Sequence, residues 1–197
     1  MPLAILNRKH PLFPDAETLI ETVFAREYGA VISHLPDRIL AVLDDNDGVL
    51  CAAGLRDSVS GIFSECYLDR AVEQAIEEKA GKAVHRDQIL ELTALAAVRP
   101  GAMALLLRGF AEIGLEAGYR WGLFTATARL RRMARRIGIE LIELADASRD
   151  QVSDPDCWGN YYDQNPAVCA VEGRPAQGRL KSGLLTPCGA KERLPVK

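Results

Sequence analysis

One stretch, residues 89–107, constrains the fold more than any other, because it joins a strand pattern, a turn and a helix pattern. Side chains alternate between the two faces of the predicted strand: Ile89, Glu91, Thr93 and Leu95 on one, and Leu90, Leu92, Ala94 and Ala96 on the other. Arg99-Pro100-Gly101 ends the strand, and an apolar helix is predicted over 102–117. Free N–H groups at the start of such a helix attract anions. The stretch therefore predicts a central strand and an anion site, with the Glu91 carboxylate just upstream.

The segments around this stretch predict an α/β fold in which a mixed sheet is flanked by helices. Further strands are predicted over 38–44, 49–56, 120–125 and 139–144, with residues 62–67 as a short strand or extended segment. Further helices are predicted over 15–28, 69–79 and 128–137, with Asp15 and Asp69 as N-caps and Gly29, Gly81 and Gly138 at their ends. Asp45-Asn46-Asp47-Gly48 is a hairpin signal, so the first half should be antiparallel. Two strand–helix units in the second half predict a parallel pair.

The length of 197 residues fits one domain followed by a tail, and an apolar fraction of 48% is enough for a full core. We expect the domain to cover residues 1–171. Residues 172–197 contain few large apolar residues and many glycines, prolines and basic residues. This composition predicts a disordered, basic C-terminal tail.

Charge and cysteine content exclude several classes of function. The net charge of −3 gives no sign of nucleic-acid binding. Apolar runs stay below the roughly 18 residues of a membrane-spanning helix, so no membrane insertion is expected. The first eight residues are too short and mixed for a signal peptide. Five cysteines without a CxxC motif and three scattered histidines predict reduced thiols, no metal site and a cytoplasmic location.

Polar residues of the central stretch allow both a structural and a functional interpretation. Glu91 and Thr93 share a strand face, which alternation alone would make solvent-exposed. If the strand is central, the same face borders a cleft, where a carboxylate can orient or deprotonate an amine. Arg99-Pro100-Gly101-Ala102 is either an ordinary strand–helix turn or a phosphate site.

Three later segments also allow both a structural and a functional interpretation. Thr125 and Thr127 lie where a strand meets a helix, so they either cap the helix or contact a ligand. The helix after them has its apolar side at Leu130, Met133, Ala134 and Ile137 and carries five arginines: Arg129, Arg131, Arg132, Arg135 and Arg136. That basic face is either solvated or a dock for an acidic partner or phosphate. Residues 158–163, Trp-Gly-Asn-Tyr-Tyr-Asp, either seal the core or line a pocket.

Several motifs together resemble the thermostable hemolysin family. They are Val23-Phe24, Ala52-Ala53-Gly54-Leu55-Arg56, Glu91-Leu92-Thr93, Ala96-Ala97-Val98-Arg99-Pro100-Gly101, Trp121-Gly122-Leu123-Phe124-Thr125-Ala126-Thr127 and Trp158-Gly159-Asn160-Tyr161-Tyr162-Asp163. The resemblance covers roughly residues 10–172. This family in turn is similar to acyl-homoserine lactone (autoinducer) synthases and to the wider GNAT acyltransferases. The resemblance implies a GNAT-like sheet, splayed between its fourth and fifth strands, that admits an acyl thioester.

The resemblance also implies roles for particular residues. Glu91-Leu92-Thr93 looks like the Glu-Leu-Ser of the synthases, so Glu91 and Thr93 are the expected catalytic positions. The expected contacts of the acyl donor are Ala96, Val98, Arg99, Gly101, Ala102, Met103, Phe124, Thr125, Thr127 and Arg132. The expected contacts of the acceptor substrate are Phe24, Arg56, Trp158, Tyr161 and Tyr162.

Two departures bear on the substrates. Ala94 stands where the synthases carry an arginine, and Gly101 lies one place early in the GNAT phosphate-loop pattern, with Ala102 in place of a glycine. The second departure favours an acyl carrier protein over acyl-CoA as donor. The expected activity is N-acyl transfer from either thioester to the amine of a small molecule, such as an amino acid or its derivative. The alternatives are a membrane-active, haemolytic protein and a non-catalytic ligand-binding module. Oligomeric state is left open.

Overall fold

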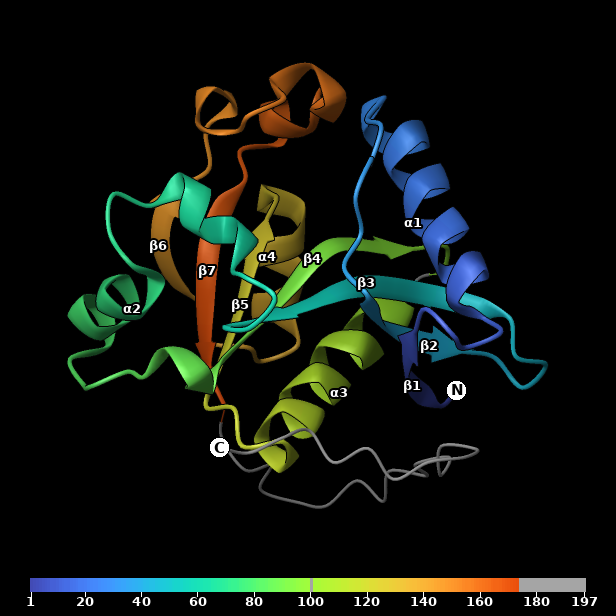
Figure 1. The fold of residues 1–197 in the computed structure, drawn as a ribbon, viewed down its shortest axis with the longest axis horizontal. Coiled ribbons are helices and arrows are strands. Elements are labelled where there is room, and N and C mark those ends of the chain that lie inside the picture. The colour runs from blue at the N-terminus through green and yellow to red at the C-terminus, as the bar shows by residue number, and fades with distance from the viewer. Residues whose placement is uncertain (100, 174–197) are drawn as a thin grey trace.

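A computed structural model describes residues 1–99 and 101–173, and these form one seven-stranded sheet flanked by helices (Figure 1). The strands are β1 (Leu3–Asn7), β2 (Arg38–Leu43), β3 (Val49–Asp57), β4 (Ile89–Ala97), β5 (Trp121–Ala126), β6 (Ile142–Asp146) and β7 (Ala167–Glu172). The helices are α1 (Phe13–Tyr28), α2 (Val72–Ala80), α3 (Ala102–Glu116) and α4 (Ala128–Arg136). Short 3₁₀ segments are η1 (Phe63–Tyr67), η2 (Arg86–Gln88), η3 (Arg149–Gln151), η4 (Pro155–Trp158) and η5 (Tyr161–Gln164). The predicted mixed sheet is thereby confirmed.

The strand order is β1-β2-β3-β4-β5-β7-β6, and among the described strands only β4 and β5 pair in parallel. The predicted hairpin and the predicted parallel pair are both confirmed. Two strands were not predicted, β1 and β7. The last predicted strand is β6, which begins at Ile142 rather than Ile139. It is not a neighbour of β5, because β7 lies between them.

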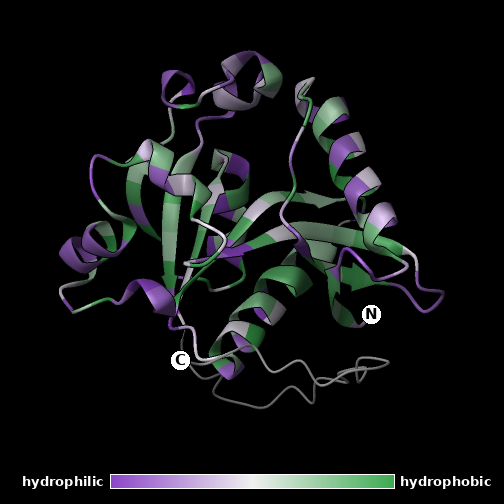
Figure 2. Cartoon of the chain, viewed as in Figure 1, coloured by the Kyte–Doolittle hydropathy of each residue, from purple (hydrophilic) through white to green (hydrophobic). Residues whose placement is uncertain are grey.

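Three apolar clusters hold helices on both faces of the sheet. On one face, α3 and α4 pack on β2–β5 and β7 through residues such as Leu106 and Phe110. On the other face, α1 covers the β1–β4 side and α2 covers the β5–β7 side. Figure 2 shows hydrophobic strands and a hydrophobic α3, with hydrophilic residues gathered on the outer sides of α1 and α2. Between α1 and α2, the 3₁₀ segment η1 packs on this face, with Tyr67 in the same cluster as α2.

Two helix starts and one predicted strand differ from the prediction, whereas two helix ends agree with it. The N-cap positions of α1 and α2 are Leu12 and Ala71, so Asp15 and Asp69 are not caps. Gly29 and Gly81 end these helices in left-handed conformation, as predicted. Residues 62–67 are not a strand, because most of them form the 3₁₀ segment η1. The N–H groups that begin η1 bond a carboxylate on β4, as described below.

A bulge in β4 changes the direction of the side chains that follow it. Gly54 on β3 pairs with Thr93, but Ala52 pairs with Ala96, so β4 carries one extra residue, and Ala94 has a φ of +49°. After the bulge, Ala96 packs with the α1 cluster and Leu95 with the α3 cluster. This is the reverse of the uninterrupted alternation predicted for residues 89–96.

Two further findings concern the described residues alone. None of their helices is long and apolar enough to cross a bilayer. Cys51, Cys66, Cys157 and Cys169 are all free thiols, as predicted, and no group of His, Cys, Asp or Glu in this part of the chain is arranged to hold a metal ion. The fifth cysteine and nearly all of the predicted tail, 172–197, lie outside the described residues.

Candidate functional site

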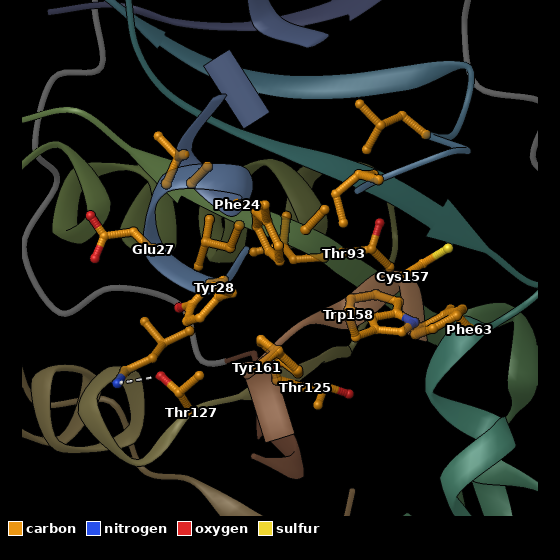
Figure 3. Close-up of a pocket in the computed structure, with 18 of the residues that line it drawn as sticks. Phe24, Glu27, Tyr28, Phe63, Thr93, Thr125, Thr127, Cys157, Trp158 and Tyr161 are labelled. Carbon is orange, nitrogen blue, oxygen red and sulfur yellow. Dashed lines mark hydrogen bonds between the residues drawn. The ribbon is translucent and has the colours of Figure 1, made fainter. Parts of the chain in front are cut away.

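A cavity of about 730 Å³ opens where β4 and β5 separate. The two strands pair only from Ile89 with Trp121 to Leu92 with Phe124; beyond that point β4 continues beside β3, and β5 continues beside β7. The cavity is lined by residues 92–97 of β4, by Thr125 of β5 and by the segments that begin α3 and α4. It also reaches the C-terminal end of α1 and the η4 segment (Figure 3). The parting of two parallel strands therefore gives a ligand access to the middle of the sheet.

Aromatic side chains close the cavity on the α1 side. Tyr161 contacts Phe24, Tyr28 and Trp158 with ring centroids 5.2–6.2 Å apart, and Trp158 contacts Phe63 at 5.8 Å. Figure 3 shows these rings, drawn from four separate segments, gathered around one space. We call these five residues the aromatic roof. Such rings bury a large apolar area, so the cavity suits a partly apolar ligand.

Backbone hydrogen bonds fix the roof to the end of α1. The N–H of Asn160 donates to the carbonyl of Tyr28 at 2.8 Å, and the N–H of Val31 donates to that of Cys157 at 2.7 Å. Gly159 lies between these bonds with a φ of +52°, and a Cβ there would be 2.0 Å from the Tyr28 carbonyl oxygen. Glycine is thus required at this position by conformation and by space.

Glu91 is a fully buried carboxylate beneath the cavity rather than on its wall. Its Oε2 accepts a hydrogen bond from the N–H of Phe63 at 2.7 Å. Its Oε1 accepts from the N–H of Ser64 at 2.8 Å and from the Ser64 hydroxyl at 2.6 Å. Burial raises the pKa of Glu91, while these hydrogen bonds and the charge of Arg56 oppose the rise. The carboxylate is therefore held in place by η1 and disposed to accept a proton.

Three hydroxyl residues, Ser64, Thr125 and Thr93, lie on the cavity wall near this carboxylate. Ser64 and Thr125 both line the cavity, and their side-chain oxygens are 2.9 Å apart. Thr93 lines it too, and its buried hydroxyl has no hydrogen-bond partner among the described residues. An unpartnered buried hydroxyl is costly unless something satisfies it. A polar group of a ligand in the cavity would do so.

The start of α3 presents backbone N–H groups at the mouth of the cavity. Arg99, Gly101 and Met103 line it, and the N-cap Gly101, with a φ of +88°, makes no side-chain capping bond. Arg99 is exposed and forms no ion pair within the described residues. A helix N-terminus beside a cationic side chain favours an anion.

Helix α4 borders the cavity through its first turn. The Thr127 hydroxyl accepts from the N–H of Leu130 at 3.3 Å, so Thr127 caps the helix while also lining the cavity (Figure 3). Arg131 does not point into solvent with the other arginines, because it donates to the carbonyls of Ala126 and Asn165. The predicted apolar side of α4 does face the core. The exposed arginines are Arg129, Arg132, Arg135 and Arg136.

Most of the residues singled out in the sequence meet at this cavity. Those that line it are Phe24, Arg56, Thr93, Ala96, Val98, Arg99, Gly101, Met103, Thr125, Thr127, Trp158 and Tyr161. Those that do not are Glu91, Ala102, Phe124, Arg132 and Tyr162. Among the lining residues that sequence reasoning missed are Tyr28, Phe63, Ser64 and Cys157. Tyr28 continues the apolar face of its helix and could have been found; Ser64 follows a turn and carries no local signal.

Comparisons with known structures show that the fold is shared with acyl-transferring enzymes. The chain is similar to the acyl-homoserine lactone synthase LasI, with a TM-score of 0.59 and 14% identity over 87% of this chain and 89% of that one. It is similar to BjaI, a CoA-dependent acyl-homoserine lactone synthase solved with SAM and isopentyl-CoA, with a TM-score of 0.56 and 16% identity over 88% and 83%. It is also similar to FeeM, an N-acyl amino acid synthase from uncultured soil microbes, with a TM-score of 0.54 and 14% identity over 86% and 93%.

Sequence comparison is more specific about the family than about the activity. No curated protein sequence matches this chain. Residues 6–176 match the sequence profile described as thermostable hemolysin. That range contains most of the sheet, all four helices and the cavity. The chain therefore belongs to the thermostable hemolysin family.

Proposed function

We propose that this protein is an N-acyltransferase that moves an acyl group from an acyl thioester to the amine of a small molecule. The observation that carries the proposal is the cavity between the diverging strands β4 and β5. Its wall combines an unpaired strand edge, aromatic rings and a helix N-terminus. The likeness of the fold to BjaI and FeeM supports the same reaction class.

The proposed reaction is direct attack of the amine on the thioester carbonyl. The pantetheine arm of the donor lies against residues 93–98. Here β4 is not paired with β5, so backbone N–H groups on that side of β4 polarise the thioester carbonyl. Its phosphate binds the N–H groups that begin α3, beside Arg99. Glu91 accepts the proton that the amine loses. Seven of the ten donor contacts expected from the sequence line the cavity, whereas Ala102, Phe124 and Arg132 do not, so their proposed roles are indirect.

The acceptor that fits best is an amino acid or a related amine with an anionic group. More arginines than carboxylates line the cavity. The arginines are Arg26, Arg56, Arg99 and Arg129, and the carboxylates are Glu27 and Asp154. Arg26 is paired with Glu27, whereas the hydrogen bond of Arg56 within the described residues is a long one, 3.3 Å to the Ser60 carbonyl, and its charge also acts on Glu91. Arg56 can therefore turn to a substrate carboxylate. The aromatic roof, with Phe24, Trp158 and Tyr161, contacts the apolar part of the substrates.

The direct test is product formation by the full-length chain. The protein is incubated with octanoyl-CoA or octanoyl-carrier protein and each of the twenty L-amino acids, and products are identified by mass spectrometry. An N-octanoyl amino acid together with a stoichiometric free thiol would support the proposal. Saturable binding of octanoyl-CoA without any product would instead assign a non-catalytic ligand-binding module. Lysis of vesicles in the absence of any acyl thioester would favour the membrane-active alternative.

A charge reversal on α4 distinguishes a carrier-protein donor from CoA. Arg132 and Arg136 are exposed, lie on the helix face that continues from Arg129, and do not line the cavity. Acyl carrier proteins are acidic, and steering of such a partner depends on long-range charge. We expect Arg132→Glu with Arg136→Glu to lower kcat/KM for octanoyl-carrier protein at least tenfold, about 1.4 kcal/mol. Turnover of octanoyl-CoA should change much less.

The control for this variant is Lys79→Glu with Arg108→Glu, which makes the same change in net charge at exposed positions of α2 and α3. It should leave kcat/KM for both octanoyl donors unchanged. The loss with the carrier protein should also shrink as salt is raised, because the Debye length is only about 8 Å at physiological ionic strength. Equal losses with both donors would place these arginines on the phosphates of the donor.

A further inference from the structure

We propose that the hydroxyls of Thr125 and Ser64 form the proton path between an amine in the cavity and the buried carboxylate of Glu91. The inference rests on the proposed N-acyl transfer, adds Ser64 to its residues and gives Thr125 a role in proton transfer. Thr125 would contact the reacting amine, and Ser64 would act through Thr125. Ser64 was not among the residues predicted from the sequence.

The need for a path follows from the burial of Glu91. Its side chain has no exposed surface and does not line the cavity, so a bound amine cannot reach it directly. Ser64 and Thr125 do line the cavity. Ser64 Oγ is 2.6 Å from Glu91 Oε1 and 2.9 Å from Thr125 Oγ1. Three oxygens at hydrogen-bond distance thus connect the carboxylate to the cavity wall.

The Glu91 carboxylate determines the direction of both hydrogen bonds, from Thr125 to Ser64 and from Ser64 to Glu91. An ionised carboxylate can only accept, so the Ser64 hydroxyl donates to Glu91. Its hydrogen is then occupied, and Ser64 Oγ accepts from the hydroxyl of Thr125. The lone pairs of Thr125 Oγ1 remain available for a donor in the cavity. An ammonium group placed there would complete a chain in which every donor already points toward Glu91.

The proton steps balance without any further reactant. An acceptor that enters as an ammonium gives one proton to Thr125 Oγ1, Thr125 passes its own proton to Ser64 Oγ, and Ser64 passes its own to Glu91. The neutral amine then attacks the carbonyl carbon, the C–N bond forms, and the C–S bond breaks. The second amine proton goes to the departing thiolate, which leaves as a thiol. Glu91 returns its proton to solvent by the reverse path after the products leave.

The surroundings of Glu91 suit this exchange. Burial raises the pKa of its carboxyl group, which brings it closer to that of an amine. Two other charged or titratable groups interact with it. Arg56 on β3 stabilises the carboxylate, and burial together with the charge of Glu91 raises the pKa of the Cys66 thiol in η1 to about 11. That thiol therefore stays protonated at neutral pH and does not compete for the proton.

The test compares the pH dependence of Thr125→Val, Thr125→Ser and Ser64→Ala with that of the full-length wild type. The substrates are octanoyl-CoA or octanoyl-carrier protein and the L-amino acid with the highest turnover in the product assay. At pH 7 we expect Thr125→Val and Ser64→Ala to lower kcat at least tenfold with little change in the KM for the thioester. The loss should shrink above the pKa of the free amine, because the acceptor then arrives deprotonated. Thr125→Ser, which keeps the hydroxyl, should retain most of the wild-type rate.

The control is Thr18→Val, which removes an exposed hydroxyl of α1 that does not line the cavity. It should behave as wild type. A loss in Thr125→Val that is the same at every pH would overturn the relay and indicate a structural role for Thr125. Wild-type rates in both hydroxyl deletions would also overturn it, while leaving the acyltransferase itself standing. A wild-type protein that releases no thiol with any amino acid would refute the proposed function and the relay together.

Discussion

Replacing Glu91 by glutamine should lower turnover by about 10²–10⁴-fold, the range that a lost general base costs. The substitution keeps the shape of the side chain but removes its capacity to accept a proton. Because Glu91 acts from below the cavity, the KM for the thioester should change little. The measurement is kcat for N-octanoyl product formation, with KM determined in the same experiment. Wild-type turnover would remove Glu91 from the mechanism.

The same variant should fold but lose some stability. The carboxylate accepts from the N–H of Phe63 on one oxygen and from Ser64 on the other. Glutamine has one acceptor oxygen, so its NH₂ group would face a backbone donor and leave it unsatisfied, at a cost of about 1–3 kcal/mol. Thermal unfolding separates this cost from the catalytic loss. Glu77→Gln on the exposed side of α2 is the control, and should change neither quantity.

Gly159→Ala should produce the largest loss of stability. Its backbone, with a φ of +52° and a ψ of −125°, is disfavoured for any residue with a Cβ, at about 1–3 kcal/mol. The Cβ would also be 2.0 Å from the Tyr28 carbonyl oxygen, a backbone atom that cannot simply rotate away. Overpacking of this kind adds about 1–3 kcal/mol. We expect the Tm to fall by roughly 5–15 °C.

A matched glycine separates the two causes of this loss. Gly118 after α3 has a φ of +95°, but a Cβ added there would meet no atom within 4 Å, so Gly118→Ala carries the conformational cost alone. Gly159→Ala should therefore be clearly the less stable of the two. It should also weaken substrate binding, since Trp158 and Tyr161 of the aromatic roof would shift away from α1. Equal Tm values in the two variants would show that the end of α1 yields to the new methyl group.

Elements that depend on near neighbours could be predicted from the amino-acid sequence alone. The strand–turn–helix of residues 89–116, the hairpin at Asp45–Gly48 and the left-handed helix ends at Gly29 and Gly81 all formed where they were predicted. Apolar periodicity and turn chemistry act over a few residues, so they can be read locally. The sequence motifs also identified twelve of the residues that line the cavity, although most of these came from family resemblance rather than from periodicity.

How these elements build the site depends on tertiary contacts that no local pattern encodes. Phe63–Tyr67 form a 3₁₀ segment whose first N–H groups bond a carboxylate 27 and 28 residues further along the chain. The alternation of β4 reverses at Ala94 because the pairing with β3 accommodates an extra residue. Beyond Leu92 and Phe124, β4 pairs with β3 alone and β5 pairs with β7 alone, so the parallel pair separates there. Each of these outcomes depends on hydrogen bonds between residues far apart in sequence, whose partners become defined only when the whole sheet assembles.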